Sequence, residues 1–182
     1  ELKDLGVAKD LDFADYRFHR VEVERYQGNW KTFIEVYLED YHVDPFHPGL
    51  GHFVDCRNLA WQFGDWYSVQ TVGLNRELTR PGSDVYAKWH ASVLARYGQN
   101  LPKYGAIWLT YYPNIMVEWY PHTLVISTVV PDGVRSYRNI IEFYYPRAIL
   151  DEFPDFIATE QAAYRETAVE DADIIRRMEA GR

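Results

Sequence analysis

The sequence predicts an α+β domain in which a curled antiparallel sheet of about six or seven strands packs against helices. The stretch from Ala106 to Pro146 holds four segments rich in β-branched and aromatic residues, with turn residues between them. Residues 16–27 alternate polar and apolar side chains, and residues 155–180 form a long amphipathic pattern that ends at Gly181. Because the connections in the strand-rich stretch are short, its strands are expected to be antiparallel neighbours.

Residues 16–27 form the first predicted strand, since a period of two suits a strand with one buried face. Asn29 is a suitable N-cap for the helix that follows. The apolar face of that helix comprises Trp30, Phe33, Ile34, Tyr37 and Tyr41. Pro45 disfavours helical geometry at Asp44, so the helix is predicted to end near Val43.

The remaining elements follow from turn residues and periodicity. Residues 59–74 predict two strands joined near Gly64. A shorter helix is predicted within residues 84–97 and is stopped by Gly98. No repeat, low-complexity tract or Pro/Gly/Ser-rich linker interrupts the chain, so we expect a single domain over residues 1–182.

The composition excludes several classes of partner. The net charge of −8 opposes binding to nucleic acid, because such binding needs a basic stripe that displaces counterions. No apolar run approaches the ~18–20 residues that span a bilayer, and the charged N-terminal residues do not suit a secretory signal. We therefore expect a cytoplasmic protein with no membrane or nucleic-acid partner. Aromatic residues make up 16% of the chain, which suits a ring-lined cavity for a small molecule.

One carboxylate lies where the last predicted helix is most apolar. Alternating steps of four and three residues from Ile157 follow one face of this helix. The positions on that face are Gln161, Tyr164, Ala168, Asp171, Ile175 and Met178. A buried ionised carboxylate is costly unless it is paired, hydrogen-bonded or bound to a metal, so Asp171 needs a partner. A salt bridge to Arg135 or another basic side chain and a metal ion are both open alternatives.

The other acidic residues of this helix are interpreted as solvated charge. They are Glu160, Glu166, Glu170 and Asp173, and they lie beside Arg165, Arg176 and Arg177. Mixed charges along a helix are typical of an exposed face.

His42 and His47 lie five positions apart, on either side of Pro45. A continuous helix would rotate them by roughly 140° from one another, but a break at Pro45 lets His42 project from the last helical turn while His47 returns from the loop. Glu39 and His42 share one line of the helix, and the alternative is that this line is a solvated face. Two histidines and one carboxylate form the facial ligand set typical of non-haem Fe(II) oxygenases, and zinc hydrolases use similar ligands.

Two segments resemble one known family. The segment NWKTFIEVYLEDYHVDPFHPGL at residues 29–50 is similar to the iron-site helix of the alpha subunits of Rieske non-haem iron ring-hydroxylating oxygenases. The segment ETAVEDADIIRRMEAGR at residues 166–182 is similar to the C-terminal helix of the same family, in which the aspartate of a Glu-Asp pair is the third ligand. The motifs occur in the expected order, 124 residues apart from His47 to Asp171.

The resemblance implies that His42, His47 and Asp171 bind a mononuclear Fe(II), with O2 as co-substrate. It implies a catalytic role for Glu39 as the acid that hydrogen-bonds a ligand histidine and bridges toward the cluster domain of a neighbouring subunit. Many members of the family have aspartate at this position, so the longer side chain of Glu39 alters the bridge. The resemblance further implies a helix-grip fold (Bet v1/START-like) assembled as a homotrimer.

The Rieske [2Fe-2S] centre of the family needs two cysteines and two histidines, and Cys56 is the only cysteine of this chain. We therefore expect residues 1–182 to be the catalytic domain alone, with the cluster in an N-terminal domain absent from this chain. The resemblance implies electron supply through a reductase or ferredoxin. It also implies hydroxylation of an aromatic or related organic substrate by a dioxygenase or monooxygenase in aromatic compound catabolism.

Five side chains near the histidines are candidate pocket walls, although each also suits an ordinary core position. They are Phe33, Tyr37, Val43, Phe46 and Leu50. Two other functions stay open. The fold would also suit a metal-free helix-grip carrier of an apolar small molecule, and the ligand set would also suit a zinc hydrolase.

Overall fold

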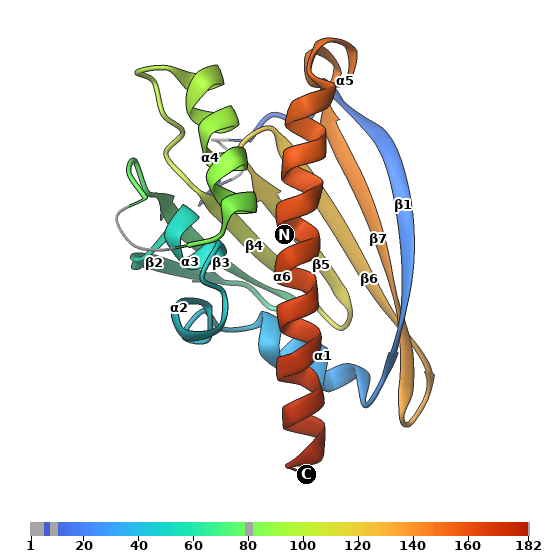
Figure 1. Cartoon of the computed structure of the whole chain (residues 1–182). Helices are drawn as coiled ribbons and strands as arrows, with labels where there is room; N and C mark the ends of the chain where they lie inside the picture. The colour runs from blue at the N-terminus through green and yellow to red at the C-terminus, as the bar shows by residue number, and fades with distance from the viewer. Residues whose placement is uncertain (1–5, 8–10, 79–81, 182) are drawn as a thin grey trace.

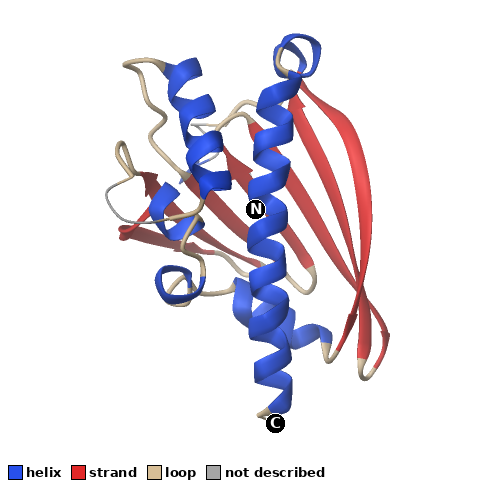
Figure 2. Ribbon diagram, in the orientation of Figure 1, coloured by secondary structure: helices blue, strands red, loops and turns tan. Residues whose placement is uncertain are grey.

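A seven-stranded antiparallel sheet carries the helices on one face, with its strands in the order β1-β7-β6-β5-β4-β3-β2 (Figure 1). The computed structural model describes residues 6–7, 11–78 and 82–181. The strands are β1 (Tyr16–Gln27), β2 (Val54–Phe63), β3 (Tyr67–Leu74), β4 (Ala106–Tyr111), β5 (Ile115–Tyr120), β6 (Thr123–Gly133) and β7 (Ser136–Pro146). The helices are α1 (Trp30–Tyr37), α2 (Val43–Phe46), α3 (Leu50–Phe53), α4 (Asp84–Tyr97), α5 (Arg147–Glu152) and α6 (Pro154–Ala180). This arrangement of a curled sheet and a long C-terminal helix confirms the α+β helix-grip prediction (Figure 2).

The sheet turns one set of side chains toward the helices, because successive residues of a strand point to opposite faces. In β7 the buried positions are Tyr137, Asn139, Ile141, Phe143 and Tyr145. In β5 they are Met116, Glu118 and Tyr120. A glutamate therefore takes one of the inward positions of the sheet.

Helix α6 runs along the helix-bearing face of the sheet and is roughly 40 Å long at a rise of about 1.5 Å per residue (Figure 1). Its buried residues include Ile157 and Ile175, which belong to the predicted apolar stripe. Helix α4 packs beside α6, and the hydroxyl of Tyr86 lies 2.6 Å from the hydroxyl of Thr167. This hydrogen bond joins the two helices one turn before Asp171.

The first helix is shorter than predicted. Helix α1 begins after Asn29, whose side chain caps it, but it ends at Tyr37 rather than near Val43. The side chain of Glu39 then accepts the backbone N–H of His42 at 3.2 Å. Such a local side-chain bond competes with continued helix and stabilises the turn that replaces it.

The sequence predicts that Pro45 ends the first helix. In the structure Pro45 instead lies inside the single-turn helix α2. The first N–H groups of any helix have no partner within that helix, so a proline in the first turn removes no hydrogen bond. Asp44, which is predicted to be non-helical, is therefore helical.

The other elements follow the predictions with shifted ends. Ser83 caps α4 and Gly98 ends it. Strand β2 begins at Val54, earlier than residues 59–74 suggest, and its pairing with β3 is irregular. The short helices α3 and α5 are not predicted, since four and six residues are too few to show a helical period. Among the described helices, none combines the length and the apolar character needed to cross a bilayer.

Candidate metal centre and its cavity

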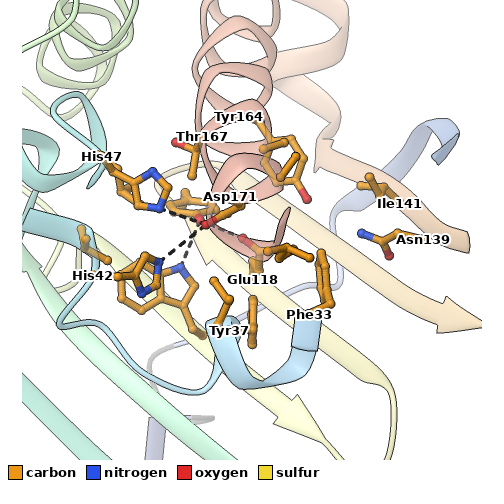
Figure 3. A pocket seen from close by; sticks show the side chains of 18 of the residues that line it. Phe33, Tyr37, His42, His47, Glu118, Asn139, Ile141, Tyr164, Thr167 and Asp171 are labelled. Atoms are coloured by element: carbon orange, nitrogen blue, oxygen red, sulfur yellow. Dashed lines mark hydrogen bonds and ion pairs between the residues drawn. The ribbon is translucent and has the colours of Figure 1, made fainter. Parts of the chain in front are cut away.

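Two histidines flank the single-turn helix α2 (Figure 3). His42 directly precedes α2 and His47 directly follows it, so the turn brings both side chains to one place. Their ring centroids lie 5.0 Å apart, with the ring planes at 75°. His42 does not project from the last turn of α1, as the sequence predicts, because α1 ends before it. The two imidazoles nevertheless converge.

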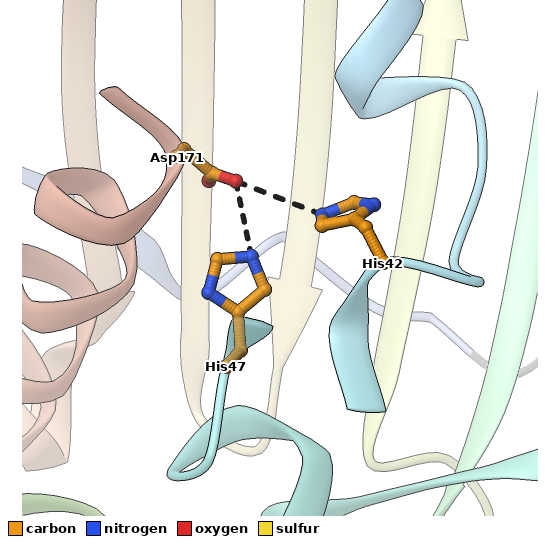
Figure 4. A group of neighbouring side chains, drawn as sticks. All are labelled: His42, His47 and Asp171. Carbon is orange, nitrogen blue, oxygen red and sulfur yellow. Dashed lines mark hydrogen bonds and ion pairs between the residues drawn. The ribbon is translucent and has the colours of Figure 1, made fainter. Parts of the chain in front are cut away.

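Asp171 of α6 completes the group (Figure 4). Its Oδ1 atom lies 3.0 Å from Nε2 of His47 and 3.6 Å from Nε2 of His42. The ligand atoms of all three residues lie within 4.8 Å of one another. The ion pairs described for Asp171 are with these histidines and do not include Arg135, the alternative partner.

Each histidine is held by a second carboxylate. Oε1 of Glu39 lies 2.6 Å from Nδ1 of His42, and Oε2 of Glu170 lies 2.7 Å from Nδ1 of His47. An ionised carboxylate only accepts hydrogen bonds, so each imidazole donates its Nδ1–H and directs Nε2 at Asp171. The interpretation of Glu170 as solvated charge is therefore wrong. The sequence signal available for it was its position directly before Asp171.

The charges of this group shift two pKa values in opposite directions. Burial alone would lower the pKa of His47, but the hydrogen bonds and charges of Asp171 and Glu170 outweigh burial and raise this pKa. Burial alone would raise the pKa of Asp171, whereas hydrogen bonds from His42 and His47 hold it below its usual value. A proton and a metal ion would compete for Nε2 of His47, because a histidine ligand must be neutral.

The donor set fits a small divalent transition-metal ion. Two ligand atoms that each lie about 2.1 Å from one metal ion, with a right angle between the two bonds, are about 3 Å from one another. The separations of 3.0 and 3.6 Å around Asp171 are close to this value. Two imidazole nitrogens and one carboxylate oxygen are the donors of non-haem Fe(II) sites with open positions, and they also suit zinc.

A cavity of about 90 Å³ lies beside the three residues (Figure 3). Its aromatic lining residues are Tyr26, Phe33, Tyr37, Tyr86, Trp89, Trp108, Tyr120 and Tyr164. Of the five candidate wall residues, Phe33, Tyr37, Val43 and Leu50 line the cavity. Phe46 does not line it and is 43% exposed, with the guanidinium of Arg177 5.9 Å from its ring centroid.

Two further carboxylates, Glu118 and Glu160, line the cavity, and neither is identified from the sequence as a cavity residue. Glu118 of β5 is 7% exposed, and the hydroxyl of Tyr120 donates to it at 2.8 Å. Nε1 of Trp108 donates to the same hydroxyl at 3.0 Å, which orients the tyrosine toward the carboxylate. Burial raises the pKa of Glu118 to about 7, and the charge of Asp171 adds to this effect.

Glu160 of α6 is the second of these carboxylates. It is 1% exposed, so its interpretation as solvated charge is wrong. The hydroxyl of Tyr145 donates to Oε2 of Glu160, and Nε2 of Gln161 donates to that hydroxyl at 3.1 Å. Burial raises the pKa of Glu160 to about 8, and the charge of Glu118 contributes. The sequence signal available for this pair was the inward position of Glu118 in the period-two pattern of β5.

Known proteins are similar to almost the whole chain. The family model described as the ring hydroxylating alpha subunit (catalytic domain) matches residues 13–182. A putrescine 2-hydroxylase from Ralstonia nicotianae is 58% identical over 182 residues, which are 100% of this chain and 50% of that protein. A putrescine 2-hydroxylase from Bordetella bronchiseptica is 50% identical over 182 residues, which are 100% of this chain and 42% of that protein. The chain thus spans about half the length of the curated relatives it matches.

The fold is also similar to that of solved Rieske oxygenases. A crystal structure of the quaternary ammonium Rieske monooxygenase CntA in complex with an inhibitor has a TM-score of 0.69 and 17% sequence identity. The match covers 97% of this chain and 42% of that chain. At this identity the similarity shows the shared fold alone.

Replacing His42, His47 or Asp171 by alanine removes one of three ligand atoms. Each variant is expected to lose stoichiometric Fe(II) after anaerobic reconstitution, whereas the wild type retains about one iron per chain, as measured by metal analysis. The control is His19→Ala, which changes an exposed histidine of β1 and is expected to keep the metal. Circular dichroism checks that each variant is folded. Full iron retention in all three ligand variants would contradict the ligand assignment.

Replacing Glu170 by glutamine removes the charge that holds Nδ1 of His47. Fe(II) affinity is expected to fall about 10- to 100-fold, because a weaker partner leaves the imidazole less basic and less well oriented. The matched control is Glu166→Gln, one turn earlier on α6, since Glu166 has no described hydrogen bond to a histidine ligand. Competition titration with a metal-binding dye measures both dissociation constants. The same constant in the two variants would show that Glu170 does not support the ligand.

Proposed function

Since the chain belongs to the family of ring-hydroxylating alpha-subunit catalytic domains of Rieske-type oxygenases, we propose that it hydroxylates a putrescine-like aliphatic diamine at a mononuclear iron site. The observation that carries the proposal is the convergence of His42, His47 and Asp171, whose ligand atoms lie within 4.8 Å of one another. The substrate class is supported by two relatives named putrescine 2-hydroxylases, at 58% and 50% identity. An aliphatic diamine thereby takes the place of the aromatic or related organic substrate that the family resemblance implies.

In this proposal the three convergent residues hold Fe(II), which supplies the activation of O2 for hydroxylation. Glu39 and Glu170 accept the Nδ1–H groups of His42 and His47, so that both Nε2 lone pairs face the ion. The charge of Glu170 also makes the imidazole of His47 more basic, which strengthens it as a ligand.

The cavity holds the substrate beside the ligands. Its walls include the rings of Phe33, Trp108 and Tyr164, together with apolar side chains such as Ile141. Walls of this kind exclude water, which strengthens electrostatic contacts within the cavity and suppresses side reactions. The buried lining therefore suits the carbon chain of an organic amine.

Electrons are proposed to come from a Rieske [2Fe-2S] cluster on another domain, supplied by a ferredoxin or reductase, in a homotrimer. Glu39 suits a role in this transfer, because its side chain is 18% exposed and lies 2.6 Å from Nδ1 of His42. It therefore joins a candidate ligand to the outside of the site. A carboxylate in that position can hold or pass a proton during turnover.

Peroxide-driven turnover tests the proposed reaction without a cluster. Hydrogen peroxide supplies the oxygen atom and both electrons, so that a substrate C–H bond and H2O2 give C–OH and water. The Fe(II)-loaded chain is expected to convert putrescine to a product with one added oxygen, detected by mass spectrometry. Asp171→Ala is expected to form none, since it lacks a metal ligand.

Two controls test whether turnover depends on peroxide and whether the substrate is an aliphatic amine. NADH without peroxide or a cluster protein is expected to drive no turnover, and naphthalene, as an aromatic probe, is expected to remain unconverted. Conversion of naphthalene in place of putrescine, or product formation without iron, would be incompatible with the proposal. Failure of the wild type to bind metal would favour the metal-free carrier instead.

Replacing Glu39 by glutamine separates electron delivery from metal binding. In a cluster-bearing protein that contains this domain, Glu39→Gln is expected to retain iron but to lower the turnover number at least tenfold, because the amide cannot carry a proton as a carboxylate does. Peroxide-driven turnover bypasses the cluster and is expected to change far less. Equal turnover of the variant and the wild type in the cluster-driven assay would remove the proposed role of Glu39.

A further inference from the structure

The cavity contains two carboxylates that no cation of its lining balances. Glu118 and Glu160 both line it, and they are 7% and 1% exposed. Among the described lining residues there is no lysine or arginine. Since buried carboxylates are costly without compensation, a pair of them facing one cavity favours a cationic ligand.

Neither carboxylate belongs to the candidate metal centre. The acids of that centre contact histidines, whereas Glu118 and Glu160 accept hydrogen bonds from the hydroxyls of Tyr120 and Tyr145. Oε1 of Glu160 has no hydrogen-bond partner among the described residues. Oδ1 of Asn139, which also lies on the cavity lining, has none either. Two acceptors of buried side chains are therefore available to a donor that enters the cavity.

One positive charge outside the lining acts on this pair, but weakly. Arg20 of β1 lowers the pKa of Glu160 as the smallest of the influences on that group. Its guanidinium forms an ion pair with Glu22 and lies 5.1 Å from the ring centroid of Phe143. Arg20 thus compensates part of the charge of Glu160 from outside the cavity lining, while its ion pair is with Glu22.

The periodicity of α6 aligns the acid pair with the metal centre. Glu160 and Asp171 are eleven residues apart, which is about three turns and roughly 16 Å along the helix, so both face the same side. The charge of Glu118 interacts with both of them. Figure 3 shows Glu118, Tyr164 and Asp171 among the residues that line the same cavity. A ligand held by Glu118 and Glu160 would therefore extend along α6 toward the histidines.

We propose that Glu118 and Glu160 bind one primary ammonium group of the substrate, select an aliphatic amine and direct its carbon chain toward the candidate metal centre. This inference rests on the proposed function and adds the residues that recognise the amine. A primary ammonium has three N–H donors, and the carboxylates of Glu118 and Glu160, including the unpartnered Oε1 of Glu160, can accept them. The aromatic walls provide apolar contact for the methylene groups and attract the cation.

The raised pKa values of the two glutamates agree with this role. Burial raises the pKa of Glu118 to about 7 and that of Glu160 to about 8, so the pair carries protons near neutral pH when no cation is bound. A bound ammonium favours the ionised carboxylates and lowers both pKa values. Amine binding at pH 7 is therefore expected to release protons to the buffer.

Isothermal titration calorimetry of the Fe(II)-loaded chain with putrescine, under anaerobic conditions, tests the site. Glu118→Gln and Glu160→Gln are each expected to weaken putrescine binding at least tenfold, because each removes one charge-assisted hydrogen bond. The matched control is Glu142→Gln. Glu142 is a glutamate of β7 next to the cavity residue Ile141, but it points to the opposite face of the sheet. The control is expected to bind putrescine as the wild type does.

A second comparison uses two ligands of the wild type, so it does not depend on whether a variant folds. The wild type is expected to bind putrescine at least tenfold more tightly than 1,4-butanediol, which has a similar length and no charge. Equal affinity for these two ligands, or unchanged putrescine affinity in both folded glutamine variants, would overturn the ammonium site while leaving iron binding and hydroxylation intact. The wild type could instead fail to bind iron and still bind putrescine more tightly than 1,4-butanediol. This outcome would contradict the proposed function and support the ammonium site.

Discussion

The negative charge of Asp171 is the constraint around which the candidate metal centre is arranged. Its carboxylate lies on the most apolar face of α6 with 29% of the side chain exposed, where an unpaired charge is unfavourable. His42 and His47 meet this charge from the two ends of α2. The single turn of α2 makes this meeting geometrically feasible, since a continued straight helix would point the two imidazoles roughly 140° apart. The local irregularity between α1 and α3 is therefore a requirement of the site.

Two pairs of carboxylates surround the candidate metal centre. One pair contacts the histidines, and the other pair lines the cavity. Glu39 and Glu170 orient the histidines and leave the centre with excess negative charge, which suits a divalent cation. Deeper in the cavity, aromatic rings exclude water around Glu118 and Glu160 and so raise their pKa values. The same rings suit an aromatic ligand when considered by themselves. Together with two acids, they suit a molecule that combines methylene groups with a positive charge.

Much of the fold and the centre of the site follow from the sequence by local rules. The alternation along the strands and the apolar stripe of α6 are periodic, and the capping of α1 by Asn29 depends on neighbouring residues. Asp171 is identifiable because a charge on an apolar stripe violates the pattern around it. The two histidines are identifiable from their spacing and from the resemblance of both segments to one family.

What the sequence by itself determined is thus the order of the strands and the longer helices, and the three candidate ligands, because each breaks or completes a short-range pattern. The tertiary structure alone decided that Glu160 is buried and that Glu170 pairs with His47, since a glutamate beside arginines has the same local pattern whether or not another element covers it. It also decided that Glu118 shares a cavity with Glu160. Burial and charge compensation depend on residues that are distant in the chain, and these distances are set only when α6 packs onto the sheet.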